Sequence, residues 1–462
     1  MKDTQRIVTP RREFLKQTGT FVAASALAGV ALPRVHAAAG DTLQIALVGC
    51  GGRGTGAAAD ALTVGGAVKV RALADVFEGK PQKTFGGLKE KFGDKVDVTP
   101  DRMFTGFDSY KQAMDTLRPG DIVVLATPPA FRWVHFTYAI GKGLNVFMEK
   151  PVTVDGPTSK RMFALGEAAT ARNLKVGVGL MSRHSRALQE LHQRIQDGEI
   201  GDLILMRGYR VQGPIGFFAS LPKPDGISEL HYQIQRFHSF LWASGGCFSD
   251  FNIHHIDQLC WMKNALPIRA EALGGRHYRQ SPDGVTYIDQ NFDVYAVEYT
   301  FPDGSKFTFD GRCMTGCQDI YSSYAHGTKG MAIVSKFGDC GLPSSTYKGQ
   351  TPRRSNLLWE SKLSPEDQNP YQNEWKDLLA AIRNDQPYNE VKSGVEASLV
   401  TSMGRMAAHT GQMVSYEDML ECEHEFAPGL DKLTADSPAP LQLAANGRYP
   451  VPEPGIKTKR EY

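Results

Sequence analysis

Residues 43–54 read LQIALVGCGGRG, an apolar run followed directly by a cluster of glycines. The run from Leu43 to Val48 is typical of a strand that is buried on both faces of a parallel sheet. The Ala-rich segment that follows, Thr55 to Leu62, is expected to be a helix. A strand, a glycine-rich turn and a helix in this order predict the first unit of a dinucleotide-binding fold.

The glycines are spaced as G-x-G-x-x-G, and each has its own task. Gly49 permits the tight turn, Gly51 lets the backbone approach a pyrophosphate, and Gly54 lets the helix pack close to the strand. The N-terminus of the helix attracts the anion. The cofactor contacts expected from this turn are Gly49, Cys50, Gly51, Gly52, Arg53 and Gly54.

Asp75 ends the next predicted strand, Val68 to Ala74, and lies 21 residues beyond Gly54. A carboxylate at this place accepts hydrogen bonds from the ribose hydroxyls of the cofactor and repels a 2′-phosphate. Asp75 therefore favours NAD over NADP. Arg53 and Lys80 are nearby cations that weaken this preference, so NADP stays open.

Strands and helices continue to alternate up to residue 182. Further strands are expected at 121–126, 144–148 and 174–180, and helices at 131–142 and 157–172. This alternation predicts a doubly wound parallel sheet, a Rossmann domain over residues 42–182. Ligands bind beyond the carboxyl ends of such strands. The residues that follow strand ends, and that are expected beside the cofactor, are Thr127, Pro128, Glu149 and Lys150.

The pattern changes after residue 182. Strands are expected at 203–210, 268–273, 294–301 and 305–310, with turns between them, and helices at 371–383 and 392–409. Consecutive strands predict an antiparallel sheet. Residues 183–430 are therefore expected to form a C-terminal α+β domain with a large, mostly antiparallel sheet. Residues 431–462 are rich in Pro and Gly, and we interpret them as a wrapping arm or a loose tail.

The N-terminus reads as an export signal. Arg11 and Arg12 precede a weakly apolar stretch, Thr18 to Leu32, and a small-x-Ala pattern at 35–37. This order resembles a twin-arginine signal peptide over residues 1–39, although Pro10 stands where Ser or Thr is usual. It predicts a periplasmic protein that the twin-arginine machinery exports folded, so a cofactor would be loaded beforehand and held tightly. The alternative is an ordinary amphipathic or disordered start.

Composition excludes several classes of function. The 462 residues carry a formal net charge of only +2, and no basic stripe with interleaved aromatics predicts nucleic-acid binding. No apolar run is long enough for a stable membrane span. The seven cysteines form no pair of zinc-type C-x-x-C motifs, so no metal site is expected, while one disulfide stays open for an exported protein.

Four stretches together resemble the Gfo/Idh/MocA family of oxidoreductases. They are the glycine turn, Thr127-Pro128-Pro129 with His135 following, Glu149-Lys150-Pro151, and the run 246–254, GCFSDFNIH. The likeness covers most of residues 42–420. It implies a nicotinamide cofactor, a sugar or cyclitol substrate, and a C-terminal sheet used for self-association, hence a homo-oligomer. His135 has either a structural place or one beside the cofactor.

The resemblance also implies that Lys150, Asp250 and His254 are catalytic. Oxidation of a secondary alcohol requires hydride transfer, proton removal and stabilisation of the developing oxyanion. We assign the oxyanion contact to Lys150 and the acid/base role to His254, with Asp250 orienting substrate hydroxyls. On a helix, Asp250 and His254 share one face. Arg183 and His255 are additional candidates for substrate contact, although His255 points elsewhere and Arg183 could instead reach the cofactor.

Two details of this half stay open. The aromatic stretch Tyr232 to Trp242, which contains His238, either walls a sugar pocket or belongs to the core. The peptide between Lys150 and Pro151 can be cis.

The leading interpretation is an exported oxidoreductase acting on a sugar or cyclitol. The alternatives are an NAD-dependent glycosidase that oxidises its substrate transiently, and a non-catalytic sensor of sugar or cofactor.

Overall fold

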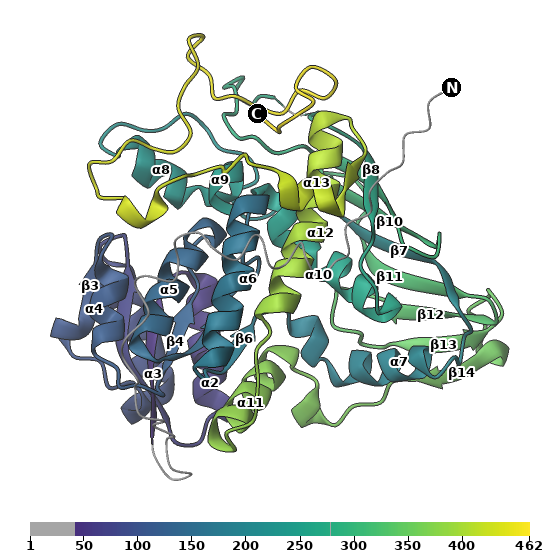
Figure 1. Ribbon diagram of the computed structural model, residues 1–462, viewed down its shortest axis with the longest axis horizontal. Coiled ribbons are helices and arrows are strands. Elements are labelled where there is room, and N and C mark those ends of the chain that lie inside the picture. Colours follow the sequence, from purple (N-terminus) through teal and green to yellow (C-terminus); the bar gives the residue numbers. More distant parts are fainter. Residues whose placement is uncertain (1–41, 278) are drawn as a thin grey trace, which may run out of the picture. The chain divides into compact units, whose positions relative to one another are not determined.

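Two sheets organise the chain, and Figure 1 shows them in a computed structural model that describes residues 42–277 and 279–462. Both sheets belong to the same structural unit. The export signal expected at residues 1–39 lies outside the described residues. The fold class expected from the sequence, a Rossmann sheet followed by a mostly antiparallel one, is confirmed.

The first sheet, sheet A, is parallel throughout. Its described strands have the order β3-β2-β1-β4-β5-β6. Their bounds are β1 Leu43–Val48, β2 Val68–Asp75, β3 Met103–Thr105, β4 Ile122–Leu125, β5 Asn145–Met148 and β6 Val176–Val178. The strand order reverses at β1, which pairs with β2 on one side and β4 on the other. Such a switch point opens a crevice for ligands at the carboxyl ends of the strands.

Helices bury both faces of sheet A, which explains its continuous apolar strands. The helices within this half are α2 Gly52–Val64, α3 Lys80–Phe92, α4 Ser109–Asp115, α5 Arg132–Lys142 and α6 Gly156–Ala171. Ile45 and Leu47 of β1 face a core shared with α2, whereas Ala46 and Val48 face the core that contains α5.

One helix from beyond residue 183 also packs on sheet A. Helix α11, Pro370–Arg383, buries Trp375 against Phe147 of β5 with ring centroids 4.6 Å apart. Arg383 donates to the carbonyl oxygen of Gly65, which follows α2. The helix expected at 371–383 is present, but it completes the Rossmann core rather than the C-terminal one.

The second sheet, sheet B, contains nine of the described strands in the order β14-β13-β12-β11-β7-β10-β9-β8-β15. Their bounds are β7 Leu203–Gln212, β8 Arg269–Gly275, β9 Val294–Thr300, β10 Lys306–Cys313, β11 Ile320–Gly327, β12 Gly330–Ser335, β13 Ser345–Lys348, β14 Leu357–Glu360 and β15 Val414–Ser415. Only β7 and β10 pair in parallel.

One face of sheet B is buried and the other is open. Helices α10, Gly246–Lys263, and α12, Val391–Thr410, pack on the sheet. Tyr299, Phe307 and Met206, aligned across neighbouring strands, are fully buried. The alternate residues point outward. The remaining described helices are α7 Arg186–Gln196, α8 Glu229–Gln235, α9 Leu241–Ser244 and α13 Tyr416–Glu421.

Residues 431–462 form a wrapping arm rather than a loose tail. In Figure 1 the arm, in yellow, passes α8 and α9. Gln233 of α8 donates to the carbonyl oxygen of Leu441 at 2.9 Å, and Tyr449 donates to Glu229. Glu461, the second-to-last residue of the arm, is almost fully buried.

Glu461 is held by two residues of α12. Arg405 donates to both carboxylate oxygens at 2.8 and 2.9 Å, and the Nδ1 atom of His409 lies 2.8 Å from Oε1. Burial would raise the pKa of Glu461, but Arg405 and His409 together lower it to about 2. A buried ion pair of this kind becomes costly when one partner is removed.

We expect Glu461→Gln to lower the free energy of unfolding by about 3 kcal/mol, because it leaves Arg405 buried without its counter-charge. Above the ordinary pKa near 4.5, the difference in the free energy of unfolding between wild type and variant has its full size. This difference shrinks as pH falls toward 2, because the pKa of Glu461 is depressed. Denaturant titration at several pH values measures both effects. The control is Glu453→Gln, in an exposed arm pair with Lys457; equal losses in both variants would contradict the account.

Candidate functional site

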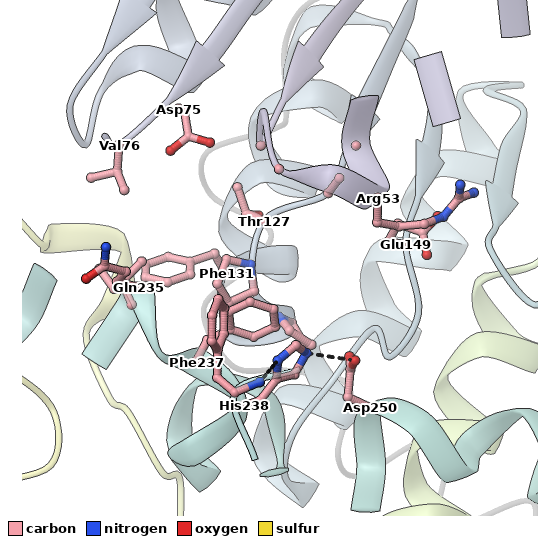
Figure 2. Close-up of a pocket in the computed structure, with 18 of the residues that line it drawn as sticks. Arg53, Asp75, Val76, Thr127, Phe131, Glu149, Gln235, Phe237, His238 and Asp250 are labelled. Carbon is pink, nitrogen blue, oxygen red and sulfur yellow. Dashed lines mark hydrogen bonds and ion pairs between the residues drawn. The ribbon is translucent and has the colours of Figure 1, made fainter. Parts of the chain in front are cut away.

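A cavity of about 1240 Å³ lies at the carboxyl ends of the sheet A strands. Residues of α10 and of the segment 216–238 form its other walls. Figure 2 shows Asp75 and Val76 at one end and His238 and Asp250 at the other, with Thr127 between them. The cavity therefore joins the switch point of sheet A to residues more than a hundred positions further along the chain.

The glycine turn leaves room where a phosphate would lie. A Cβ atom added at Gly51 or Gly52 would meet nothing within 4 Å, and both residues line the cavity. Helix α2 begins at Gly52 without a side-chain cap, so its first N–H groups have no side-chain acceptor. A Cβ at Gly54, by contrast, would lie 2.0 Å from the Gly49 carbonyl oxygen. This arrangement fits a dinucleotide pyrophosphate.

Asp75 presents its carboxylate at the end of β2. It accepts hydrogen bonds from the N–H groups of Cys50 at 2.8 Å and Phe77 at 3.0 Å. Burial raises its pKa, and these bonds counter the effect. Cys50 belongs to the glycine turn by its backbone, but its thiol is buried and contacts the Ala74 carbonyl oxygen. The Cys50 side chain is therefore outside the cavity wall.

Arg53 is tied to the wall by carboxylates. Its Nε donates to Glu149 at 2.6 Å, its Nη2 lies 3.3 Å from Glu374 of α11, and it stacks on the Tyr371 ring at 4.6 Å. Figure 2 shows Arg53 and Glu149 side by side. Arg53 is thus committed to these partners and not to a 2′-phosphate, which leaves Lys80 as the cation beside Asp75.

Thr127, Pro128 and His135 line the cavity between its two ends. Thr127 Oγ1 and His135 Nδ1 are 3.2 Å apart. Burial lowers the pKa of His135 to about 3, with Arg132 contributing, so the ring is neutral. His135 also packs on Tyr110 at 4.3 Å between ring centroids. His135 thus packs in the wall and also lines the cavity.

Lys150 and Asp250 meet in the cavity. Lys150 Nζ donates to the Asp250 main-chain oxygen at 2.7 Å and lies 3.6 Å from Oδ2 of the same residue. The Lys150–Pro151 peptide is cis, as the sequence allowed. His254, one helical turn beyond Asp250, lines the same cavity. The structure thus brings together the three residues expected to be catalytic.

The charges in this cluster are set by burial and by neighbours. Burial would raise the pKa of Asp250, but Lys150 and His238 hold it well below its usual range. Burial lowers the pKa of His254 to about 3, although Asp339 opposes the shift. Asp250 is therefore an anion and His254 a neutral imidazole. The Nδ1 atom of His254 is buried without a hydrogen-bond partner among the described residues.

Arg183 and His255 lie away from the cavity, contrary to expectation. The Arg183 guanidinium donates two hydrogen bonds to the Asp257 carboxylate, at 2.7 and 2.9 Å, and is engaged by this partner. His255 is fully buried, with its ring 4.9 Å from that of Tyr321. Neither lines the wall.

Sequence reasoning missed part of the wall near His254. Arg210 of β7 lies opposite Tyr321 of β11, with its guanidinium 4.7 Å from that ring. Tyr321 donates to Asp339 at 2.5 Å. All three line the cavity. They share no motif. The pairing of β7 with β11 brings Arg210 and Tyr321 together, and Asp339 follows β12, so spacing alone gave no signal.

Three expectations concern metals, disulfides and membranes. Within 42–277 and 279–462, no cluster of His, Cys, Asp and Glu is arranged to hold a metal ion. All seven cysteines are free thiols. Among the helices of the described chain, none is long and apolar enough to cross a membrane.

Parts of this chain match known proteins in sequence. Residues 188–333 match the GFO/IDH/MocA C-terminal domain. Inositol 2-dehydrogenase 4 of Saccharopolyspora erythraea is 31% identical over 137 residues, which are 29% of this chain and 38% of that protein. Inositol 2-dehydrogenase of Corynebacterium glutamicum is 29% identical over 96 residues, 21% of this chain and 28% of that protein. The chain thus spans about a third of these relatives in sequence alignment.

Solved structures share the two-sheet architecture over about four fifths of this chain. Scyllo-inositol dehydrogenase from Lactobacillus casei with bound NAD(H) and scyllo-inositol has a TM-score of 0.59 at 20% identity, covering 82% of this chain and 100% of that one. Aldose-aldose oxidoreductase from Caulobacter crescentus has a TM-score of 0.60 at 16% identity, covering 81% and 99%. These likenesses establish the two-domain fold.

Two glycine variants separate binding from packing. Gly51→Ala places a methyl group in the open phosphate cradle, so we expect it to weaken NAD binding about tenfold or more with little change in stability. Gly54→Ala collides with the Gly49 carbonyl, so we expect it to destabilise the fold by about 1–3 kcal/mol or more. Calorimetric titration and thermal unfolding of nucleotide-free protein measure the two effects. Unchanged NAD affinity in Gly51→Ala would contradict the assignment.

Proposed function

We propose that the protein is a nicotinamide-dependent oxidoreductase that acts on a hydroxyl group of a sugar or cyclitol. The observation that carries this proposal is that one cavity contains both the open glycine turn with Asp75 and the cluster of Lys150, Asp250 and His254. The inositol dehydrogenases and the aldose-aldose oxidoreductase described above support the substrate class.

The residues divide the chemistry among them. A bound nicotinamide would supply the hydride acceptor. Lys150 donates a hydrogen bond to the reacting oxygen and stabilises the negative charge that develops on it. His254 lines the cavity as a neutral imidazole, which leaves a ring nitrogen to accept the hydroxyl proton. Asp250, held as an anion, accepts hydrogen bonds from neighbouring hydroxyl groups of the substrate.

NAD is the proposed cofactor. Asp75 supports it, because a carboxylate at this place repels a 2′-phosphate and accepts bonds from ribose hydroxyls. The engagement of Arg53 by Glu149 and Glu374 removes one cation that would favour NADP. Lys80 is the cation that remains on this side of the cavity.

The cofactor is held tightly in this proposal. The wrapping arm contributes Asp431 and Leu433 to the cavity wall, and Leu430, directly before the arm, also lines the cavity. The turn Leu430–Lys432 contacts the turn Pro129–Phe131. In a second place, close in sequence to Asp75, His231 of α8 packs edge-on against Phe77 and Phe107, at 5.9 and 5.5 Å between ring centroids. A cover made by two segments slows release of a ligand beneath it.

Export and self-association complete the proposal. Arg11 and Arg12 with the following apolar stretch support twin-arginine export to the periplasm, where a retained cofactor would be regenerated in place. The open face of sheet B supports a homo-oligomer. It presents Leu273 of β8, which is 79% exposed, and, on the far side of β9 and β10, the outward-facing Tyr209 of β7 and Tyr324 of β11.

The nucleotide and the catalytic lysine test the function together. We expect NAD or NADH to be released when the purified protein is denatured, as identified by mass spectrometry. Lys150→Ala should retain the nucleotide but lower oxidation of scyllo-inositol, myo-inositol or D-glucose about a hundredfold, because the oxyanion contact is lost. Lys142→Ala, in a surface pair with Asp115, is the control.

The outcomes of that experiment are distinct. An unchanged oxidation rate in Lys150→Ala would favour the alternative interpretation, a non-catalytic sensor. Release of aglycone from a glycoside with no net cofactor reduction would identify an NAD-dependent glycosidase instead. Oxidation of a free sugar or inositol supports the oxidoreductase.

Retention by the wrapping arm gives a further expectation. Leu433→Ala opens the cover, so bound NAD should dissociate about tenfold faster during rapid dilution into buffer containing a nucleotide trap. Leu443→Ala, on the same arm but 51% exposed, should behave as wild type. Identical release from all three proteins would show that the arm does not hold the cofactor.

A further inference from the structure

His238 lies inside the cavity wall, in direct contact with Asp250. It belongs to the short turn Phe237–Ser239 and is buried among aromatic rings. Its ring centroid is 3.9 Å from that of Phe237 and 5.0 Å from that of Phe251. Figure 2 shows the imidazole aimed at the Asp250 carboxylate. The rings leave His238 little freedom to turn.

The hydrogen bonds of His238 fix its tautomer. The backbone N–H of Phe217 donates to Nδ1 at 3.2 Å, so Nδ1 is an acceptor. In a neutral imidazole the proton is then on Nε2. Nε2 lies 3.1 Å from Asp250 Oδ2. His238 therefore donates to the carboxylate, and it has no free lone pair with which to act as a base.

This hydrogen bond gives the two carboxylate oxygens of Asp250 different surroundings. Oδ2 accepts the hydrogen bond from His238 Nε2–H and lies 3.6 Å from Lys150 Nζ. Oδ1 accepts no hydrogen bond from the part of the chain that the structure describes, and Asp250 lines the cavity. Oδ1 is thus the oxygen left for a hydroxyl group of the substrate.

We propose that His238 is a positioning residue that holds Asp250 in the rotamer that offers Oδ1 to the substrate. The proposal rests on the proposed oxidoreductase function. His238 acts on substrate only through Asp250. Its loss should therefore raise KM through poorer orientation and lower kcat less.

The charge of Asp250 depends on the same bond. The charged and titratable groups that face Asp250 are Lys150, Arg132, His254, Cys247 and His238. Burial alone raises the pKa of Asp250, and Lys150 and His238 together reverse that effect. Without the His238 donor the pKa of Asp250 rises, so the acidic limb of kcat/KM moves to higher pH.

A purely structural role is the rival explanation. His238 closes the turn at residues 216–217, where a Cβ on Gly216 would lie 2.6 Å from Nδ1. Two isosteric variants separate the roles. The amide of Gln places a donor where Nε2 was, and the amide of Asn places an acceptor where Nδ1 was. His238→Gln therefore preserves the bond to Asp250, and His238→Asn preserves the bond from Phe217.

The experiment compares wild type, His238→Gln and His238→Asn with scyllo-inositol, myo-inositol and D-glucose as probes. We expect His238→Asn to raise KM about tenfold and to shift the acidic limb upward, while His238→Gln restores both toward wild type. Bound NAD and thermal stability should match in the two variants. Rescue by Asn rather than Gln, or wild-type behaviour of both, would overturn the proposal. An inactive wild type with all probes would instead refute the oxidoreductase function itself.

Discussion

The contact between Lys150 and Asp250 is the interaction on which the site depends. It joins the end of β5 in the Rossmann sheet to helix α10, which packs on the other sheet, across a hundred residues of sequence. An ammonium and a carboxylate that are both largely buried stabilise each other only at close range. Their pairing therefore fixes the positions of the ammonium and the carboxylate relative to the glycine turn.

Arg405 of α12 supports that contact from behind. Its guanidinium donates to the Val154 carbonyl oxygen, four residues after Lys150, and to Ser249 Oγ, one residue before Asp250. One fully buried cation thus binds both segments that carry the site, and Glu461 of the wrapping arm balances its charge. Arg405 therefore links the wrapping arm to the two chain segments that carry Lys150 and Asp250.

Much of this could be predicted from the sequence, because the features were local. The glycine turn, the strand ending at Asp75 and the spacing of Asp250 and His254 follow from backbone geometry. Other features depended on long-range packing. The position of α11 on sheet A, the Arg183–Asp257 pair and the pairing of Arg210 with Tyr321 join distant segments. The sequences of these segments contain no periodic pattern that indicates which distant segment each of them contacts. The sequence did not predict strands β11 to β14, because these strands are short or are interrupted by bulges.

The central claim is that a substrate hydroxyl group at Lys150 and His254 lies within hydride-transfer distance of a nicotinamide bound at the glycine turn. Carbon-deuterated scyllo-inositol, myo-inositol or D-glucose, incubated with the purified protein, tests it most directly. The account predicts that deuterium from at least one of these probes appears in the reduced nucleotide released on denaturation, as a mass increase of one unit. Reduced nucleotide without deuterium, or a bound nucleotide that stays oxidised with every probe, would contradict it.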